Sequence, residues 1–223
     1  MKIFINIFLV IAFIFNNLSA NKIAVTTKVK GLVEIMAVGN DNFKDLKPGT
    51  ILSDGDKLRT GSSGFVAVIF IDDKSTLKLK ENSEAVISGQ RSSKSIAKKI
   101  NMDIGTIRAT VNKQNTDFVI QTPTSVASVK GTDFWLITDP AEGDLIIGLE
   151  GLVGLTNSET GEEIDVSEGL SGISTPDGSL EVEETNSTTV PDDPTDDGEE
   201  ENLIRIYLEG PNGEQKVMII DYQ

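Results

Sequence analysis

Short apolar runs, separated by Gly, Asp and Asn, recur through most of the chain. The clearest run, residues 64–71 (GFVAVIFI), is rich in β-branched and aromatic residues and lies next to the turn-forming sequences Gly-Ser-Ser-Gly and Asp-Asp-Lys-Ser. This pattern predicts a largely buried strand between two tight turns. In the next run, residues 75–79, Leu77 and Leu79 alternate with lysines, which predicts a partner strand with one dry face and one wet face.

Many short strands with frequent Gly and Asp turns predict an all-β fold, either a sandwich or a barrel. A short β-helix or β-roll is the alternative, because the spacing between the runs is irregular. Pro123 cannot donate to a ladder, so we expect the strand before it to end at Gln121. The candidate strands are residues 32–36, 58–60, 64–71, 75–79, 84–88, 96–102, 106–111, 117–121, 125–129, 134–138, 144–149, 152–156 and 163–166.

Residues 1–20 have the features of an export signal. Lys2 supplies a positive start, residues 3–15 supply an apolar core, and Leu-Ser-Ala supplies a small-residue cleavage site, which predicts a secretory signal peptide cut after Ala20. The apolar run is short for a membrane span, and an uncleaved anchor is the alternative. We therefore expect a periplasmic or extracellular protein with no membrane span after cleavage, whose β domain occupies residues 21–180.

The sequence from residue 181 to residue 201 is strongly acidic. It holds ten acidic residues of a chain whose formal net charge is −15, with no Lys or Arg and only two valines to bury. This composition predicts a disordered linker. Its charge argues against nucleic acid and anionic lipid as partners. Weak, nonspecific binding of divalent cations is the most that it supports, because Thr195 and Ile204 stand where an EF-hand loop starting at Asp193 requires ligands.

Residues 202–223 return to the strand pattern. Two strand-like runs joined by Gly-Pro-Asn-Gly predict a C-terminal β-hairpin, which should dock on the main domain or on a partner because an isolated hairpin is marginal in water. The strand at residues 134–138 offers a surface for it. Alternation gives this strand apolar side chains on both faces, so Trp135 and Ile137 need a cover unless they bind a partner themselves.

The chain has no cysteine and no histidine. These omissions exclude disulfides, Cys/His zinc sites, and catalytic triads or general bases that use His. Ser95 and Lys98 satisfy a Ser-x-x-Lys spacing, but their segment fits a strand better. Asp54 and Asp56 form an Asp-Gly-Asp sequence, which is far more often a turn than a pair of glycosidase carboxylates. We therefore predict no enzymatic activity, no cofactor and no metal site. A basic cluster, interpreted as a solvated loop rather than a recognition patch, comprises Arg91, Lys94, Lys98 and Lys99.

Two blocks of sequence match one family in the right order. The first block has Gly-Asp followed by Arg-Thr-Gly, and the second has Thr-Pro followed by Lys-Gly-Thr and Phe. With these motifs the chain resembles the FecR-type domain over roughly residues 28–172. The candidate motif residues, interpreted as structural positions that could also form a partner surface, are Gly55, Asp56, Arg59, Thr60, Gly61, Thr122, Pro123, Lys130, Gly131, Thr132, Phe134 and Trp135.

The resemblance implies a jelly-roll-like β-sandwich. The family members best known for function are membrane-spanning anti-sigma regulators, which place this domain outside the cytoplasm as a sensor. Residues 1–20 leave no room for their cytoplasmic sigma-binding region, so we expect only the outer β domain to carry over. The leading hypothesis is a non-enzymatic, extracytoplasmic protein-binding or sensory scaffold module with an unknown protein or envelope partner. The alternatives are a carboxylate-dependent polysaccharide-active enzyme, and a structural envelope component or adhesin.

Overall fold

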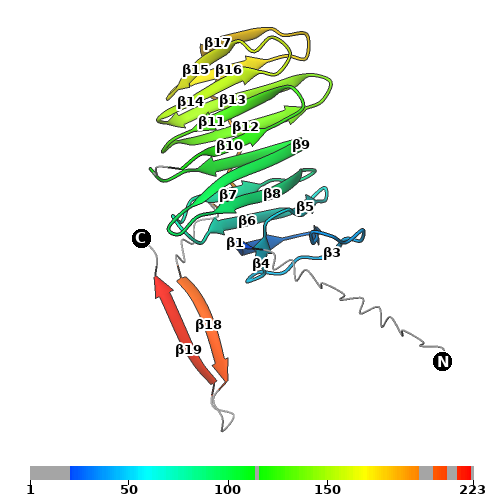
Figure 1. Ribbon diagram of the computed structural model, residues 1–223, viewed down its shortest axis with the longest axis vertical. Helices are drawn as coiled ribbons and strands as arrows, with labels where there is room; N and C mark the ends of the chain where they lie inside the picture. Colours follow the sequence, from blue (N-terminus) through cyan, green and yellow to red (C-terminus); the bar gives the residue numbers. More distant parts are fainter. Residues whose placement is uncertain (1–20, 114–115, 196–202, 210–214, 222–223) are drawn as a thin grey trace, which may run out of the picture.

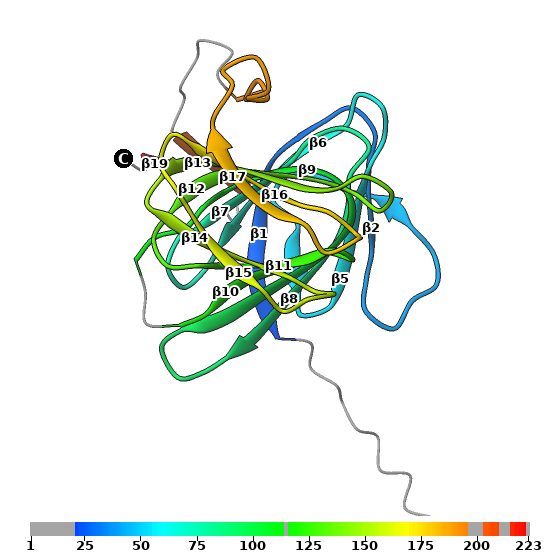
Figure 2. The ribbon, with the colours of Figure 1, turned by 90° about the horizontal axis from the view of Figure 1, so that it is seen from above.

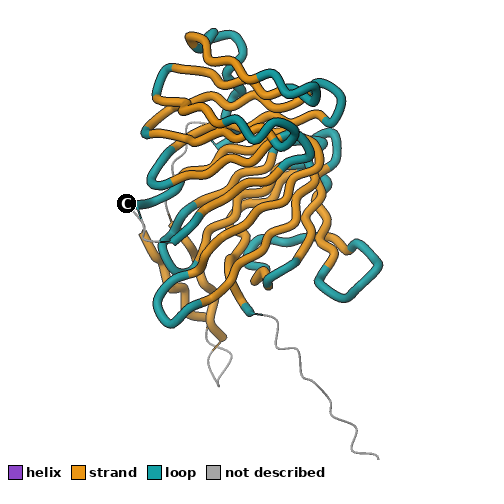
Figure 3. Tube along the Cα trace, turned by 45° about the horizontal axis from the view of Figure 1, so that its top comes forward, coloured by secondary structure: helices purple, strands orange, loops and turns teal. Residues whose placement is uncertain are grey.

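The computed structural model describes residues 21–113, 116–195, 203–209 and 215–221. Every regular element among them is a β-strand (Figure 3), which confirms the prediction of an all-β fold. The expected signal peptide and the last part of the acidic segment lie outside the described residues. Within the described part of the chain, no helix is long and apolar enough to cross a membrane.

Seventeen strands, most of them labelled in Figure 1 and β2 in Figure 2, build the main body of the molecule. They are β1 (Lys22–Lys30), β2 (Val33–Met36), β3 (Lys44–Asp45), β4 (Ile51–Ser53), β5 (Asp56–Thr60), β6 (Phe65–Phe70), β7 (Thr76–Leu79), β8 (Glu84–Arg91), β9 (Ile96–Thr110), β10 (Phe118–Gln121), β11 (Ser125–Val129), β12 (Asp133–Asp139), β13 (Gly143–Glu150), β14 (Leu152–Asn157), β15 (Glu163–Ser167), β16 (Leu170–Ser174) and β17 (Leu180–Glu184).

The strands form two layers that face each other as in a β-sandwich (Figure 2). Layer A has the order β4-β1-β6-β7-β9-β12-β13-β16-β17. Layer B has the order β3-β2-β5-β8-β9-β10-β11-β14-β15. Side chains alternate along each strand, so one side of each layer fills the space between them. The buried core includes Val66, Val68, Phe70, Leu77, Leu79, Ile107, Phe134 and Leu136 from layer A, and Leu58, Ile87, Ile100, Ile120 and Leu155 from layer B.

Strand β9 belongs to both layers. Its first part pairs with β8 and β10 in layer B, and its last part, from Gly105 onward, pairs with β12 in layer A. Gly105 has a φ of 120°, and a Cβ atom there would lie 2.2 Å from the Oγ atom of Ser83. Glycine adopts this conformation at little cost, so the strand can bend here without ending. The prediction of two separate strands at residues 96–102 and 106–111 is therefore wrong.

Beyond β9 the chain builds hairpins alternately in the two layers. The pairs β10–β11 and β14–β15 lie in layer B, and the pairs β12–β13 and β16–β17 lie in layer A. This alternation explains why the strands stack one above another up to β17 in Figure 1.

The acidic segment differs from its prediction in its first part. Strand β17 pairs with β16 from Leu180 opposite Ser174 to Glu184 opposite Leu170. Backbone hydrogen bonds to β16 thus order residues 181–184, whose side chains could not form a core of their own. Disorder is the wrong prediction for these residues.

The predicted C-terminal hairpin is confirmed as a pair of strands. Strands β18 (Leu203–Glu209) and β19 (Gln215–Asp221) run antiparallel, with Leu203 opposite Asp221. The side chains of this hairpin lie outside the described part of the structure, so its docking on the main domain stays a prediction.

Candidate functional site

The Asp-Gly-Asp sequence forms the turn between β4 and β5, with Gly55 at a φ of 89°. The carboxylate of Asp56 is buried and accepts hydrogen bonds from the backbone N–H groups of Val38 (3.0 Å) and Ser53 (2.8 Å). Asp54 accepts one from a backbone N–H group of β8 at 3.0 Å. Both carboxylates bind backbone N–H groups of neighbouring segments and so fix the turn in place. The interpretation of this sequence as a turn is confirmed.

The residues of the Arg-Thr-Gly motif also make structural contacts, with backbone carbonyls and with a neighbouring side chain. Arg59 forms an ion pair with Glu34 at 2.8 Å on the exposed side of layer B. The buried hydroxyl of Thr60 donates to the carbonyl of Lys80 at 2.6 Å, and the N–H group of Gly61 donates to a carbonyl of the loop before β2. These contacts connect the two layers at the end of β5.

The Thr-Pro motif lies beside a buried carboxylate. The hydroxyls of Thr122 and Ser125 both donate to Oδ2 of Asp144, and the N–H group of Ser125 donates back to the Thr122 hydroxyl at 2.8 Å. Oδ1 of Asp144 is buried and has no hydrogen-bond partner among the described residues. This cluster fixes the tight turn between β10 and β11, where Pro123 follows the end of β10 as predicted.

The Lys-Gly-Thr motif forms the corner between β11 and β12. Gly131 has a φ of 74°, and a Cβ atom there would lie 2.5 Å from Cγ of Lys113, which confirms the predicted bend. The backbone groups of Thr132 and Val111 exchange hydrogen bonds of 3.0 and 2.7 Å. Lys130 is exposed. The motif therefore directs β12 into layer A.

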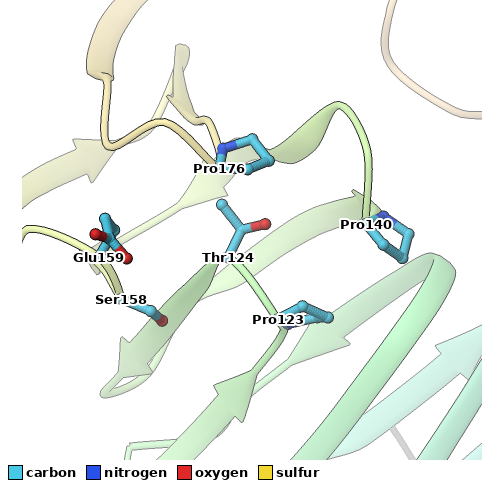
Figure 4. A pocket seen from close by; sticks show the side chains of 6 residues that line it. All are labelled: Pro123, Thr124, Pro140, Ser158, Glu159 and Pro176. Atoms are coloured by element: carbon cyan, nitrogen blue, oxygen red, sulfur yellow. The ribbon is translucent and has the colours of Figure 1, made fainter.

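The turns of the four alternating hairpins meet at one edge and enclose a shallow cavity of about 170 Å³. Figure 4 shows the residues that line it: Pro123, Thr124, Pro140, Ser158, Glu159 and Pro176. Glu159 is the one acidic residue of this lining. Glycoside hydrolysis needs two carboxylates, so this cavity does not support the polysaccharide-active alternative.

Lys98 lies in the interior rather than in a solvated loop. Its fully buried ammonium group contacts Asp72 at 3.0 Å and Asp73 at 2.9 Å. Burial opposes ionisation of Asp72, but hydrogen bonds from Lys98 and from the N–H group of Ile96 outweigh it and lower the pKa of this carboxyl. The Lys98 side chain thus contacts two carboxylates, an arrangement that holds an ion-pair network together. The solvated-loop prediction is wrong for Lys98, because alternation along β9 turns this side chain inward to the two aspartates.

Phe134 and Trp135 point to opposite sides of β12. Phe134 belongs to the core, whereas Trp135 lies on the outer side of layer A and is only 1% exposed. The register places Trp135 opposite Arg108 on β9, and Arg108 opposite Lys78 on β7. The Arg108 guanidinium group and the Lys80 ammonium group lie 5.8 and 6.0 Å from the centre of the indole ring. We call Lys78, Lys80, Arg108 and Trp135 the Trp135 face.

Part of the acidic segment lies on the Trp135 face. We call residues 191–195 the acidic strap. The side chain of Asp193 is 3% exposed, and its Oδ2 atom contacts Nζ of Lys78 and Nη1 of Arg108, each at 2.7 Å. Figure 2 shows the chain leaving β17 on the side of layer A.

Neighbouring groups reinforce these ion pairs. The hydroxyl of Thr195 donates to Oδ1 of Asp193 at 2.6 Å and accepts from Nζ of Lys78 at 2.6 Å. Burial opposes ionisation of Asp193, but the hydrogen bonds from Lys78 and Thr195 outweigh it and hold the pKa of this carboxyl well below its usual range. A hydrogen bond to Asp133 likewise raises the pKa of the Arg108 guanidinium group. Asp193 and Arg108 are therefore both charged at neutral pH.

The motif residues do not converge on one site. The first block lies at the β4–β5 turn and the end of β5, the Thr-Pro motif lies at the hairpin edge, and Trp135 lies on the outer side of layer A. Trp135 and the alternating lysines of β7 were predicted from the sequence. Asp193 was considered only as a calcium ligand, and no sequence pattern indicated the contact between Arg108 and Asp193, which lie 85 residues apart in the chain. Among the described residues, no group of three or more acidic side chains could hold a metal ion. The Trp135 face offers cations beside an aromatic ring, which suits the binding of an anionic ligand.

Comparison with known proteins adds a family and a fold. The family described as FecR protein matches residues 56–153. No curated protein matches the chain. Two crystal structures of a candidate anti-sigma factor from Parabacteroides distasonis ATCC 8503 are similar. The structure at 2.50 Å resolution has 13% identity and a TM-score of 0.51, and the structure at 1.65 Å has 15% identity and a TM-score of 0.49. Each comparison covers 59% of this chain and 61% of the other, so this chain spans about three fifths of the solved chains, and the likeness concerns the fold alone.

Proposed function

We propose that this chain, whose residues 56–153 form a FecR-type domain, is a non-enzymatic regulatory or sensory module that acts outside the cytoplasm by binding another protein. The observation that carries the proposal is the Trp135 face, where Arg108 and Lys80 lie 5.8 and 6.0 Å from the centre of the indole ring on the outer side of a sheet and Lys78 lies opposite Arg108. Trp and Arg are the residues that contribute most to binding energy at protein interfaces.

The geometry of the acidic residues supports the non-enzymatic part of the proposal. The carboxylates of Asp54 and Asp56 accept hydrogen bonds from backbone N–H groups, and Asp144 is buried beneath two hydroxyls. A screen of the purified chain on esters, peptides and glycans should show no turnover. Turnover that is abolished by Asp54→Asn or Asp56→Asn would favour the polysaccharide-active alternative instead.

Site-specific photo-crosslinking in the producing cell tests the binding part. A photoreactive amino acid at Ile137, which lies half-buried on the same side of β12 as Trp135, should give one discrete crosslinked protein. The same amino acid at Lys99, an exposed residue of β9 in layer B, is the matched control and should not give that product. No product, or identical products from both positions, would contradict a binding role for this side of layer A.

The export part has a separate test. The features of residues 1–20 support cleavage after Ala20, so the N-terminal sequence of the chain from the extracytoplasmic fraction should begin at Asn21. A chain that stays in the cytoplasm with Met1 or Lys2 at its start would refute this part and leave the binding proposal standing.

A further inference from the structure

Two like charges face each other on the Trp135 face. Lys78 and Arg108 occupy directly opposite positions on neighbouring strands, an arrangement that destabilises a sheet unless an anion lies between the two side chains. Arg108 has a second anionic partner in Asp133, at 2.8 Å. The hydrogen bonds of the Lys78 ammonium group, among the described residues, both go to the acidic strap. The two opposed cations therefore need an anion on the outer side of layer A to offset their repulsion.

The strap supplies this anion through polar contacts. Asp193 bonds Lys78 and Arg108, and Lys80 donates to the carbonyl of Asp192 at 3.1 Å. Lys30, at the end of β1, donates to the carbonyl of Pro194 at 3.0 Å. No strap residue belongs to the hydrophobic core of the described chain. Because charges rather than buried apolar area hold the strap in place, an anionic competitor can replace it without disturbing the core.

We propose that the Trp135 face is a binding site for an acidic peptide segment of a partner protein, and that the acidic strap occupies this site as an internal substitute until the partner displaces it. The inference rests on the proposed function, since it names the class of partner for the same face. The contacts of the strap also indicate which groups the ligand has. Like Asp193, the ligand has a carboxylate that contacts Lys78 and Arg108, and like Thr195, it has a hydroxyl two residues later that contacts Lys78.

A labelled peptide with the sequence of residues 188–195 (TTVPDDPT) tests this site in the full-length chain. In wild-type protein the strap competes with the peptide, and Asp193→Asn removes the carboxylate that both of its ion pairs need. The matched control is Asp192→Asn, because the side chain of Asp192 is exposed and, among the described residues, it is the carbonyl of Asp192 that contacts the Trp135 face. Fluorescence anisotropy should show the peptide binding Asp193→Asn about tenfold more tightly than Asp192→Asn or wild type.

A second variant shows where the peptide binds. Adding Lys78→Met to Asp193→Asn should weaken peptide binding by about tenfold, while melting curves confirm that both chains are folded. Binding to Asp193→Asn that is no tighter than binding to Asp192→Asn would overturn the proposal. Binding that is insensitive to Lys78→Met would also overturn it, because the peptide would then sit elsewhere.

The experiments distinguish a failure of the acidic-peptide site from a failure of the proposed protein-binding function. A crosslinked partner at Ile137 without peptide binding by Asp193→Asn would refute the acidic ligand and leave the proposed function intact. Peptide binding that depends on Lys78, without a crosslinked partner in cells, would support the acidic-peptide site and count against the proposed function.

Discussion

Lys78 and Arg108 lie opposite each other on β7 and β9, and a single carboxylate oxygen of Asp193 contacts both side chains at 2.7 Å. This relationship joins the acidic end of the described domain to the middle of layer A. It explains how a segment with several like charges can lie against the sheet at residues 191–195: cations of the sheet offset the repulsion within the segment.

The contribution of Asp193 to stability should depend on pH. The pKa of this carboxyl is lower in the folded chain than its unfolded value of about 3.9, so its ion pairs stabilise the folded state above that pH and are lost as the pH falls through the folded pKa. The free energy of unfolding of wild type should exceed that of Asp193→Asn by a constant amount between about pH 5 and pH 8, and the difference should shrink below about pH 4. Urea unfolding at each pH measures it, and a difference that grows on acidification would be the wrong sign.

The hydroxyl of Thr122 should contribute measurably to stability. Replacing it in Thr122→Val leaves the buried Asp144 carboxylate with one donor fewer and should lower the free energy of unfolding by about 1–3 kcal/mol. Thr124→Val, a neighbouring buried position, is the matched control and should cost less. Denaturant unfolding compares the two variants, and equal losses would argue against a role for this hydrogen bond.

Gly105, the single glycine of β9, should be sensitive to substitution. Gly105→Ala forces a side chain into a φ of 120° and against Ser83, so we expect a loss of about 3 kcal/mol or more. Gly161→Ala also has a positive φ, but its Cβ would meet open space, and it should cost about 1–2 kcal/mol. Thermal and urea unfolding measure the loss of stability in both variants. A smaller loss for Gly105→Ala than for Gly161→Ala would contradict the proposed role of Gly105 in the bend.

Lys98 should behave as a buried ion-pair partner. Lys98→Ala leaves Asp72 and Asp73 without their shared cation and should destabilise the chain by about 3–5 kcal/mol. Lys99→Ala, one residue further along and exposed, should change stability by no more than about 0.5 kcal/mol. Similar values for the two variants in urea unfolding would restore the solvated-loop interpretation.

Local patterns predicted much of the fold. The strand at residues 64–71, its pairing with residues 75–79, and the strand end before Pro123 each depend on residues that are close in sequence, and the structure confirms them. Strand β1 was not predicted, because lysines and threonines interrupt its apolar pattern. It forms because it pairs with β6, from Ala24 opposite Phe70 to Lys30 opposite Phe65.

The candidate site was harder to predict, because its residues meet only through the fold. Alternation on β12 correctly placed Trp135 opposite the core side of the strand and predicted that it needs a cover. Composition alone predicted that the acidic segment repels itself. It could not show that Lys78 and Arg108 would lie side by side and bind Asp193, since this contact depends on the pairing of β7 with β9.

The most direct test of this account uses Trp135, which is the single tryptophan of the chain. Its fluorescence in the full-length protein reports on the Trp135 face, and acrylamide quenching measures how open that face is. If the acidic strap covers it, Asp193→Asn should show a red-shifted emission and easier quenching than wild type, whereas Asp192→Asn should match wild type. Equal emission and quenching in all three chains would contradict the claim that the strap holds the Trp135 face closed.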